Sequence, residues 1–272
     1  KSPSPDSLEA IMKYGFIGCG NMGGPLAIAL SKATKDILIT DRSGKAKTLA
    51  DSLGCGYGSI QAVAEECDRI FLGVKPQMMA GVLESIRPVL QRRKPLLITM
   101  AASLTTRRIQ EMSGTSLPVI RIMPNTPAAV GKGVTLYCSN ALVDADMMTS
   151  FLEDMNHAGL LQPLDEHLFD AASAVSGSGP AFLYMFLEAM ADGAVACGVP
   201  RSKAMELAAA TMVGAGEMYL NSREHPGMLK DAVCSPAGST IAGIRVLEKG
   251  GFRSAVTEAV IATYQRNLEI DK

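Results

Sequence analysis

Charged residues are scarce in this chain of 272 residues, and neither sign of charge predominates. Asp, Glu, Lys and Arg make up 19% of the sequence, against roughly 25% in an average soluble protein. The 26 basic and 27 acidic side chains leave a net charge of −1, so we expect no nucleic-acid partner. Because 47% of the residues are apolar, the shortage of charge indicates that a second subunit covers part of the surface.

The six cysteines lack the spacing of a disulfide framework or a zinc site. They form no C-x-x-C pair, and the three histidines share no ligand spacing with one another. Such cysteine usage is typical of the reducing cytoplasm, so we expect a cytoplasmic protein without a metal site. No apolar run reaches the roughly 18 residues of a membrane span, so we expect no membrane partner.

Residues 1–11 lack the basic start and the apolar centre of a signal peptide. We interpret them as an expression remnant or a disordered leader and exclude them from the fold. The rest of the chain is long enough for two modest domains that need neither disulfides nor metals. The pattern of expected elements changes near Asp165, so we expect one domain over 12–164 and another over 165–272.

Strand and helix patterns alternate in the first domain, which favours βαβ units, right-handed crossovers and a parallel sheet. We expect strands at 14–17, 37–40, 69–74, 96–100 and 118–122, and helices at 23–32, 44–53, 60–66, 77–90 and 105–112. The second domain shows helical patterns rich in Ala, Leu and Met, which favour a bundle. These helices are expected at 166–175, 180–197, 201–220, 226–233, 239–249 and 252–270. The fold class is therefore α/β, with an all-α C-terminal domain.

A G-x-G-x-x-G motif runs from Gly18 to Gly23, directly after the first strand and at the start of a helix. Gly18 permits the tight turn, Gly20 lets the backbone approach a pyrophosphate, and Gly23 lets the helix lie close to the strand. Asn21 and Met22 complete the loop, and the helix N-terminus offers N–H groups to phosphates. The motif in this context predicts a Rossmann dinucleotide-binding domain.

The second strand ends at Asp41, Arg42 and Ser43. An acidic residue at this position binds the ribose hydroxyls of NAD, whereas an arginine and a serine hold the 2′-phosphate of NADP. Both kinds of residue are present, so the local pattern leaves the choice between the two cofactors open.

Further candidate cofactor residues follow other strand ends, because ligands of open parallel sheets bind outside the carboxyl ends of the strands. Small side chains there let the nicotinamide ribose approach, although ordinary strand-to-loop turns use the same residues. One candidate lies in a loop between two prolines, beyond the last expected strand. The candidates are Val74, Lys75 and Pro76, then Ala101 and Ala102, and finally Asn125.

Ser235, Gly238, Ser239 and Thr240 cluster where a late helix begins. The free N–H groups of a helix start form a natural carboxylate site, although plain helix capping also explains these residues. No Ser/His/Asp triad, Cys/His pair or acidic pair stands out. A reductase needs none of these, since its nicotinamide supplies the electrons and the protein supplies position.

Five segments together make the sequence similar to a known family. In chain order they read GFIGCGNMGGPLA, GVKPQ, RIMPNTPAAVGKG, AVSGSGPAFLYMFLEAMADG and HPGMLKDAVCSPAGSTIAGIRVLEKGGFRSAV. With these segments the chain resembles the pyrroline-5-carboxylate reductases from Met12 to Glu269. The resemblance implies reduction of 1-pyrroline-5-carboxylate to L-proline, the last step of proline biosynthesis. It also implies NADPH as cofactor with NADH as the alternative, and a homodimer of interlocked C-terminal helices, with a decamer as a further assembly.

The resemblance carries the family's cofactor positions onto the glycine loop, the Arg42–Ser43 region and the two later strand ends, and its substrate positions onto Glu166, Ser239 and Thr240. We expect the N–H groups at Gly238, Ser239 and Thr240 to bind the substrate carboxylate. The Thr240 hydroxyl is expected to hydrogen-bond the ring nitrogen, which makes it the candidate catalytic residue.

Some positions depart from the family pattern. Asp41 stands where NADP-using relatives often carry asparagine, Ser103 follows the two alanines in place of a glycine, and Ala232 replaces an asparagine. Ala237 replaces a common glycine, which is harmless only if the backbone there does not have a positive φ.

Two other classes of protein share the first motif. One is an NADP-linked hydroxyacid or imine reductase, which usually carries a catalytic lysine or aspartate on the helix between its domains. No lysine occurs between Ser176 and Lys203, which argues against that class. The other is a dinucleotide-sensing or scaffold protein, which has no use for the Ser/Thr-lined helix start.

Overall fold

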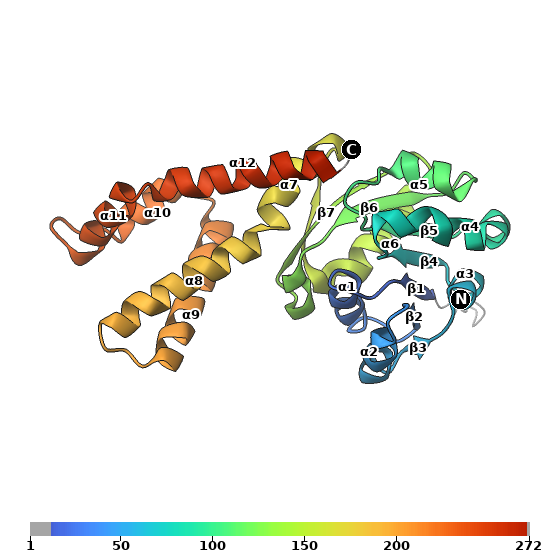
Figure 1. The fold of residues 1–272 in the computed structure, drawn as a ribbon, viewed down its shortest axis with the longest axis horizontal. Helices are drawn as coiled ribbons and strands as arrows, with labels where there is room; N and C mark the ends of the chain where they lie inside the picture. The colour runs from blue at the N-terminus through green and yellow to red at the C-terminus, as the bar shows by residue number, and fades with distance from the viewer. Residues whose placement is uncertain (1–11, 271–272) are drawn as a thin grey trace, which may run out of the picture. The chain divides into compact units, whose positions relative to one another are not determined.

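The computed structural model describes residues 12–270 and divides them into two compact units (Figure 1). The sheet unit comprises residues 12–177 together with 267–270, and the helical unit comprises Ser178–Arg266. The contacts within the structure divide the two units between Gly177 and Ser178. The domain boundary predicted at 164/165 stays a prediction. The interpretation of residues 1–11 concerns a segment outside those described.

The sheet unit is built on an eight-stranded sheet in the order β3-β2-β1-β4-β5-β6-β7-β8. The strands are β1 (Tyr14–Ile17), β2 (Ile37–Thr40), β3 (Gly56–Tyr57), β4 (Arg69–Leu72), β5 (Leu96–Thr99), β6 (Val119–Met123), β7 (Gly133–Ser139) and β8 (Gly159–Pro163). All five predicted strands are confirmed, and the order of the first six is that of dinucleotide-binding domains. A purely parallel sheet was the wrong prediction, because β7 pairs with β6 in the antiparallel direction.

Sequence patterns missed β3, β7 and β8 for physical reasons. β3 has only two residues, both exposed. β8 is largely exposed and ends in a proline, so it carries no continuous apolar run. β7 begins with a glycine and mixes buried, half-buried and exposed residues without a regular alternation. It returns along β6 through the short 3₁₀ helix η1 (Thr126–Val130).

The helices of the sheet unit lie on both faces of the sheet (Figure 1). They are α1 (Gly23–Leu30), α2 (Lys45–Leu53), α3 (Ile60–Glu66), α4 (Pro76–Arg93), α5 (Thr106–Ser113), α6 (Ala145–Met155) and α7 (Phe169–Ser176), with short 3₁₀ helices η2 (Asn156–Ala158) and η3 (Glu166–Leu168). Side chains of Ser59, Thr105 and Asp144 accept hydrogen bonds from the first turns of α3, α5 and α6, which satisfies N–H groups without a partner inside the helix. Only α6 was missed by the sequence patterns.

Two large apolar cores and a smaller cluster around Phe169 fill the spaces between the sheet and its helices. One core contains Phe16 and Phe71, whose rings stack with centroids 4.4 Å apart. The other contains Ile17 and Leu72, the next residues along the same strands. Successive strand residues point to opposite faces, so β1, β2, β4 and β5 are buried on both sides. Burial on both faces leaves the strand ends as the places where a ligand can bind.

A buried ion pair lies where β4 begins, at the edge of the sheet opposite the glycine loop. Arg69, only 5% exposed, pairs with Asp154 of α6 and donates to Ser150 Oγ at 2.6 Å. Burial raises the pKa of Asp154, while hydrogen bonding to Tyr14 and the charge of Arg69 oppose that rise. The network ties α6 to the amino ends of β1 and β4.

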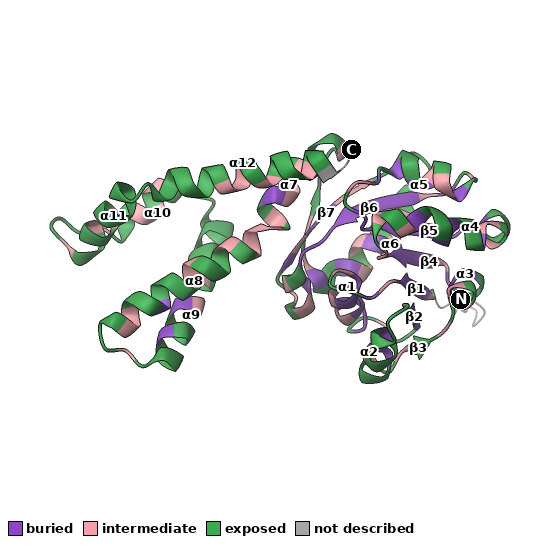
Figure 2. Cartoon of the chain, in the orientation of Figure 1, coloured by how far each residue is buried: buried purple, intermediate pink, exposed green. Residues whose placement is uncertain are grey.

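The helical unit contains α8 (Gly179–Ala196), α9 (Arg201–Ser222), α10 (Pro226–Ala232), α11 (Ser239–Lys249) and most of α12 (Phe252–Ile270). These bounds confirm the predicted helices to within one or two residues. Most of the unit is exposed (Figure 2), and its buried residues are alanines of α8 and α9, Ala191, Ala204 and Ala208. Large apolar side chains such as Met185, which is 72% exposed, lie uncovered along the helices. None of the described helices is long and apolar enough to cross a membrane.

Candidate active site

The three glycines of the G-x-G-x-x-G loop are required for three different reasons. Gly18 has a φ of +97°, and a Cβ there would lie 2.7 Å from the Gly73 carbonyl. A Cβ at Gly23 would lie 2.3 Å from the Gly18 carbonyl oxygen. A Cβ at Gly20 would meet nothing within 4 Å. Gly18 and Gly23 therefore serve the fold, whereas Gly20 keeps a space open in front of the loop.

That open space fits a pyrophosphate. It lies at the start of α1, where no side chain caps the helix, so backbone N–H groups are left for an anion. Gly20 lets the ligand approach the backbone that a side chain would shield. The geometry leaves room for a dinucleotide at this loop, and the roles that the sequence predicts for its residues stay predictions.

Gly73 also packs against the glycine loop, although no sequence pattern predicted a role for it. A Cβ at Gly73 would lie 2.3 Å from the Gly18 carbonyl oxygen and 3.3 Å from the Met100 sulfur. The carboxyl ends of β1, β4 and β5 are therefore packed closely at this point. The signal was present as the first residue of the GVKPQ segment, directly after a strand pattern.

Asp41 and Ser43 are hydrogen-bonded to each other at the end of β2. The Asp41 carboxylate accepts bonds from the Ser43 N–H at 3.1 Å and from the Ser43 hydroxyl at 2.8 Å. The neighbouring Arg42 is exposed, and no ion pair is recorded for it within the described residues 12–270. An acidic and a basic group are thus both available where the ribose of a dinucleotide would lie.

The other strand ends predicted from the sequence lie along the same edge of the sheet. Lys75 precedes α4 and Pro76 is its first residue, with Val74 half-buried before them. Ala101 is buried and Ala102 is exposed, directly after β5. These residues follow β4 and β5, which are neighbours in the sheet.

Asn125 is buried and holds three segments together. Its side-chain nitrogen donates to the Ser176 carbonyl oxygen at 2.8 Å, and its side-chain oxygen accepts from the Val134 N–H at 2.8 Å. The amide thereby joins the loop after β6 to β7 and to the end of α7. Its role in holding the cofactor stays a prediction.

Glu166 lies in η3 and is bonded within the sheet unit. Its carboxylate accepts from the Thr106 N–H at 2.8 Å and lies 3.4 Å from both the Thr106 hydroxyl and the Arg121 guanidinium. Arg121 also donates to the Ala102 carbonyl oxygen. Glu166 and Arg121 line a pocket of about 360 Å³ together with Ser103 and Thr105. Sequence patterns gave no indication of Arg121, because it lies inside an apolar strand run.

In the helical unit, Ser235 to Gly238 form a tight turn before α11. The Gly238 N–H donates to the Ser235 carbonyl oxygen at 3.0 Å, and Gly238 precedes α11 without a side-chain cap. A Cβ at Gly238 would lie 2.4 Å from the Ser235 hydroxyl oxygen. Ser239 and Thr240 begin the helix and are exposed. Their role in binding a substrate stays a prediction.

Ala237 corrects one expectation. It has a φ of +57°, which is the left-handed conformation that disfavours alanine. The turn has proline at its second position and a positive φ at its third, an arrangement that usually requires glycine. The condition under which this alanine would be harmless is therefore not met.

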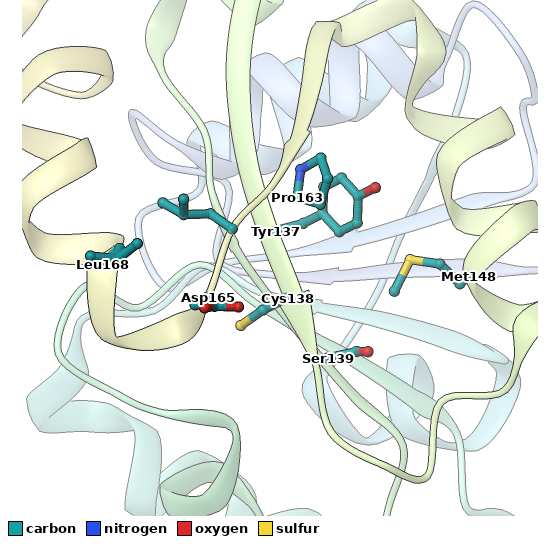
Figure 3. Close-up of a pocket in the computed structure, with 8 residues that line it drawn as sticks. Tyr137, Cys138, Ser139, Met148, Pro163, Asp165 and Leu168 are labelled. Atoms are coloured by element: carbon teal, nitrogen blue, oxygen red, sulfur yellow. The ribbon is translucent and has the colours of Figure 1, made fainter.

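A separate pocket of about 490 Å³ lies beside β7 and β8 (Figure 3). It is lined by Tyr137, Cys138, Ser139, Met148, Pro163, Leu164, Asp165 and Leu168, and none of these is a predicted site residue. Burial raises the pKa of the Cys138 thiol to about 11, so the sulfur is protonated and weakly nucleophilic at neutral pH. This pocket is not part of the candidate active site.

The strand order and the glycine loop define a class: a dinucleotide-dependent oxidoreductase with a Rossmann-type domain followed by a helical domain. Two family models match the chain. One is described as pyrroline-5-carboxylate reductase dimerisation and matches residues 166–270, and the other as NADP oxidoreductase coenzyme F420-dependent and matches residues 13–103. The chain belongs to the pyrroline-5-carboxylate reductase family, and the predicted resemblance and fold class are confirmed.

Relatives from distant organisms match over nearly the whole chain. The pyrroline-5-carboxylate reductase of Escherichia coli K12 is 39% identical over 266 residues, which cover 96% of this chain and 98% of the relative. That of Pisum sativum is 37% identical and covers 94% and 95%. A crystal structure of Plasmodium falciparum pyrroline carboxylate reductase with NADP bound has a TM-score of 0.84 at 31% identity, covering 96% and 99%.

Proposed function

We propose that this protein reduces 1-pyrroline-5-carboxylate to L-proline, the last step of proline biosynthesis, with NADPH as cofactor and NADH as the alternative. The observation that carries the proposal is the pairing, in one chain of this family, of an open glycine loop with an uncapped helix start that bears Ser239 and Thr240. The first feature suits a dinucleotide and the second a small carboxylate.

The bound dinucleotide supplies a hydride to the carbon of the ring C=N bond. The loop from Gly18 to Gly23 holds its pyrophosphate through backbone N–H groups, and the Asp41–Ser43 segment contacts its adenine-side ribose. Ala101 and Ala102 carry only methyl groups, which leaves room for the nicotinamide ribose. Lys75 and Pro76 line the same edge of the sheet.

The start of α11 holds the substrate in this proposal. The N–H groups at Gly238, Ser239 and Thr240 bind the carboxylate, with help from the hydroxyl of Ser235. The Thr240 hydroxyl hydrogen-bonds the ring nitrogen, whose protonated form accepts hydride far better. Correct alignment of the two reactants alone lowers a barrier by ~7–11 kcal/mol, so these groups act mainly by orientation.

The uncovered apolar side chains of the helical unit support self-association. The chain carries the dimerisation domain of its family, and exposed apolar surface of this extent marks an interaction site. We infer a homodimer as the basic assembly, with a decamer as a larger form, in the cytoplasm.

The proposal is tested by following oxidation of NADPH and NADH by the purified protein with 1-pyrroline-5-carboxylate. Rapid oxidation and formation of proline are expected. No oxidation by a folded protein that still binds the dinucleotide would reject the substrate.

The role of Thr240 is tested with Thr240→Ala, which should lower kcat by about tenfold to a hundredfold, the effect of losing a hydrogen bond to a charged group. NADPH affinity should not change. Thr240→Ser, which keeps the hydroxyl, should recover most of the loss. Thr211→Ala on α9 is the matched control, because among the described residues that hydroxyl donates within its own helix, to the Leu207 carbonyl oxygen. Unchanged turnover in Thr240→Ala would remove the proposed role.

A further inference from the structure

We propose that Arg121 is a positioning residue that fixes the Ala101–Ala102 segment against the nicotinamide half of the dinucleotide, with Glu166 as its counter-charge. This inference rests on the proposed placement of the nicotinamide ribose beside Ala101 and Ala102. In this proposal Glu166 affects cofactor binding by holding Arg121 in place, and it does not contact the substrate.

Arg121 is an unusual residue for its place in the fold. It lies in β6, an interior strand of the sheet, and its side chain is only 4% exposed. A buried guanidinium is costly unless its charge and its donors are paired. Glu166 supplies the opposite charge, and the Phe169 ring lies under the guanidinium with its centroid 4.8 Å from Cζ. Arg121 is therefore a buried charge that depends on specific partners, and an apolar side chain would fill the same space without them.

The guanidinium fork joins two groups at once. One terminal nitrogen, Nη1, faces Glu166 Oε1 at 3.4 Å, and the other, Nη2, donates to the Ala102 carbonyl oxygen. Arginine suits this task because its planar fork holds two acceptors in fixed directions. The position of the Ala102 backbone is therefore linked to that of Glu166.

Glu166 anchors the other end of the same loop. Its carboxylate accepts from the Thr106 N–H at 2.8 Å at the start of α5, where the helix dipole favours a negative charge. The segment between Ala102 and Thr106 is thus held at both ends by one ion pair. No other contact in the described chain replaces the bond from Arg121 to the Ala102 carbonyl oxygen, the end that meets the cofactor.

The held segment adjoins the glycine loop. Met100, directly before it, has its sulfur 3.3 Å from where a Cβ on Gly73 would lie and 4.0 Å from where a Cβ on Gly23 would lie. Met100 packs on the glycine loop, and Ala102 lies two residues further along the chain, so we expect a shift of Ala102 to change the space beside the nicotinamide ribose more than the pyrophosphate site. A displacement of about 1 Å in a positioned reactant costs about a hundredfold in rate.

The chain offers a matched control in Arg69. Its side chain is likewise buried, pairs with a carboxylate, and lies over an aromatic ring, that of Tyr14, at 5.7 Å. It begins β4, at the opposite edge of the sheet from the candidate site. Arg69→Met should therefore lower stability in the same way as Arg121→Met without altering cofactor binding.

The experiment compares binding of NADPH with binding of its analogue that lacks the whole nicotinamide riboside, 2′-phospho-ADP, by titration of the folded protein. Arg121→Met should weaken NADPH binding by about tenfold, as expected for a lost hydrogen bond to a charged donor, and leave the analogue's affinity unchanged. Arg121→Lys, which keeps the charge but not the fork, should lie between Arg121→Met and the wild type, and it replaces Arg121→Met if that variant does not fold.

Glu166→Gln gives a second, independent reading. It should weaken NADPH binding by a smaller factor than Arg121→Met, with an unchanged KM for the imine. An effect on the imine KM alone would overturn the assignment of Glu166. Equal losses for NADPH and the analogue in Arg121→Met, or an equal loss in Arg69→Met, would overturn the positioning role of Arg121. Because the titrations need no imine, a wild-type protein inactive on 1-pyrroline-5-carboxylate would refute the proposed function alone.

Discussion

One substitution, glycine to alanine, should have opposite consequences at two glycines of the same loop. Gly20→Ala adds a methyl group where nothing lies within 4 Å, whereas Gly23→Ala adds one 2.3 Å from the Gly18 carbonyl oxygen. The first methyl enters the space proposed for the pyrophosphate, and the second enters the contact between α1 and β1. Function and stability should therefore separate cleanly between the two variants.

The magnitudes follow from these distances. Forcing extra volume into a packed contact costs about 1–3 kcal/mol, and the partner of Gly23 is backbone that cannot move aside. At Gly20 the φ is not positive, so alanine should leave stability unchanged or raise it by about 0.4–1 kcal/mol through the unfolded state. The methyl group at position 20 should cost at least one hydrogen bond to the pyrophosphate, which weakens binding by about tenfold to a hundredfold.

The assay is a thermal or urea unfolding curve of each variant without ligand, followed by titration with NADPH. Gly20→Ala should unfold like the wild type and bind poorly. Gly23→Ala should unfold at lower temperature or denaturant concentration. Gly44→Ala is a control for backbone strain alone, because that glycine has a φ of +72° and no atom near its absent Cβ.

A Gly20→Ala protein that binds NADPH with wild-type affinity would refute the reasoning, since it would show that the ligand does not approach this backbone. Destabilisation of Gly20→Ala to the level of Gly23→Ala would refute it equally, because the open space would then serve the fold.

Three further outcomes are expected. Ala237→Gly should raise the free energy of unfolding by about 0.5–1 kcal/mol. Removing alanine from the left-handed region relieves about 1–2 kcal/mol, and the greater flexibility of glycine in the unfolded chain offsets about 0.4–1 kcal/mol of that gain. A lower melting temperature of the variant would contradict the turn geometry. Asp41→Asn should raise the ratio of kcat/KM for NADPH to kcat/KM for NADH by about tenfold, because a carboxylate repels the 2′-phosphate of NADPH and binds the ribose hydroxyls of NADH. An unchanged ratio would show that Arg42 and Ser43 alone decide the preference between the two cofactors. Burial raises the pKa values of Cys19 and Cys67 to about 12, so their thiolate fractions stay small until the pH approaches that value. After treatment of the folded protein with iodoacetamide at neutral pH, mass spectrometry should find both thiols unmodified. Rapid alkylation of either thiol would contradict its burial.

Much of the fold could be predicted because its local signals agree with its tertiary structure. The central strands are short apolar runs buried on both faces, and such runs are visible in one dimension. The late helices begin and end at prolines and glycines, for example at Pro200 and Gly250. The strands that were missed lie toward the edges, where half-exposed side chains blur the period of two that marks a strand.

The candidate site was predictable in part. The spacing of Gly18, Gly20 and Gly23 predicts their roles. The local sequence likewise indicates the helix start at which Ser239 and Thr240 lie. Arg121 was not predictable in this way, and the place of Gly73 after a strand pattern did not reveal its contact. Each acts through a partner distant in sequence, Arg121 through Ala102 and Glu166, and Gly73 through Gly18. Spacing along the chain carries no information about such contacts.

By itself, the sequence determined the fold class, the position of the dinucleotide loop, the family and the helix start proposed to hold the substrate, because each depends on short segments whose chemistry is local. Only the tertiary structure decided that β7 runs against β6, that Ala237 adopts a positive φ, and that Gly20 faces open space while Gly23 faces backbone. It alone placed a buried arginine between Glu166 and the Ala102 carbonyl oxygen. These are properties of which atoms meet, and atoms far apart along the chain meet only once the sheet and its helices have packed.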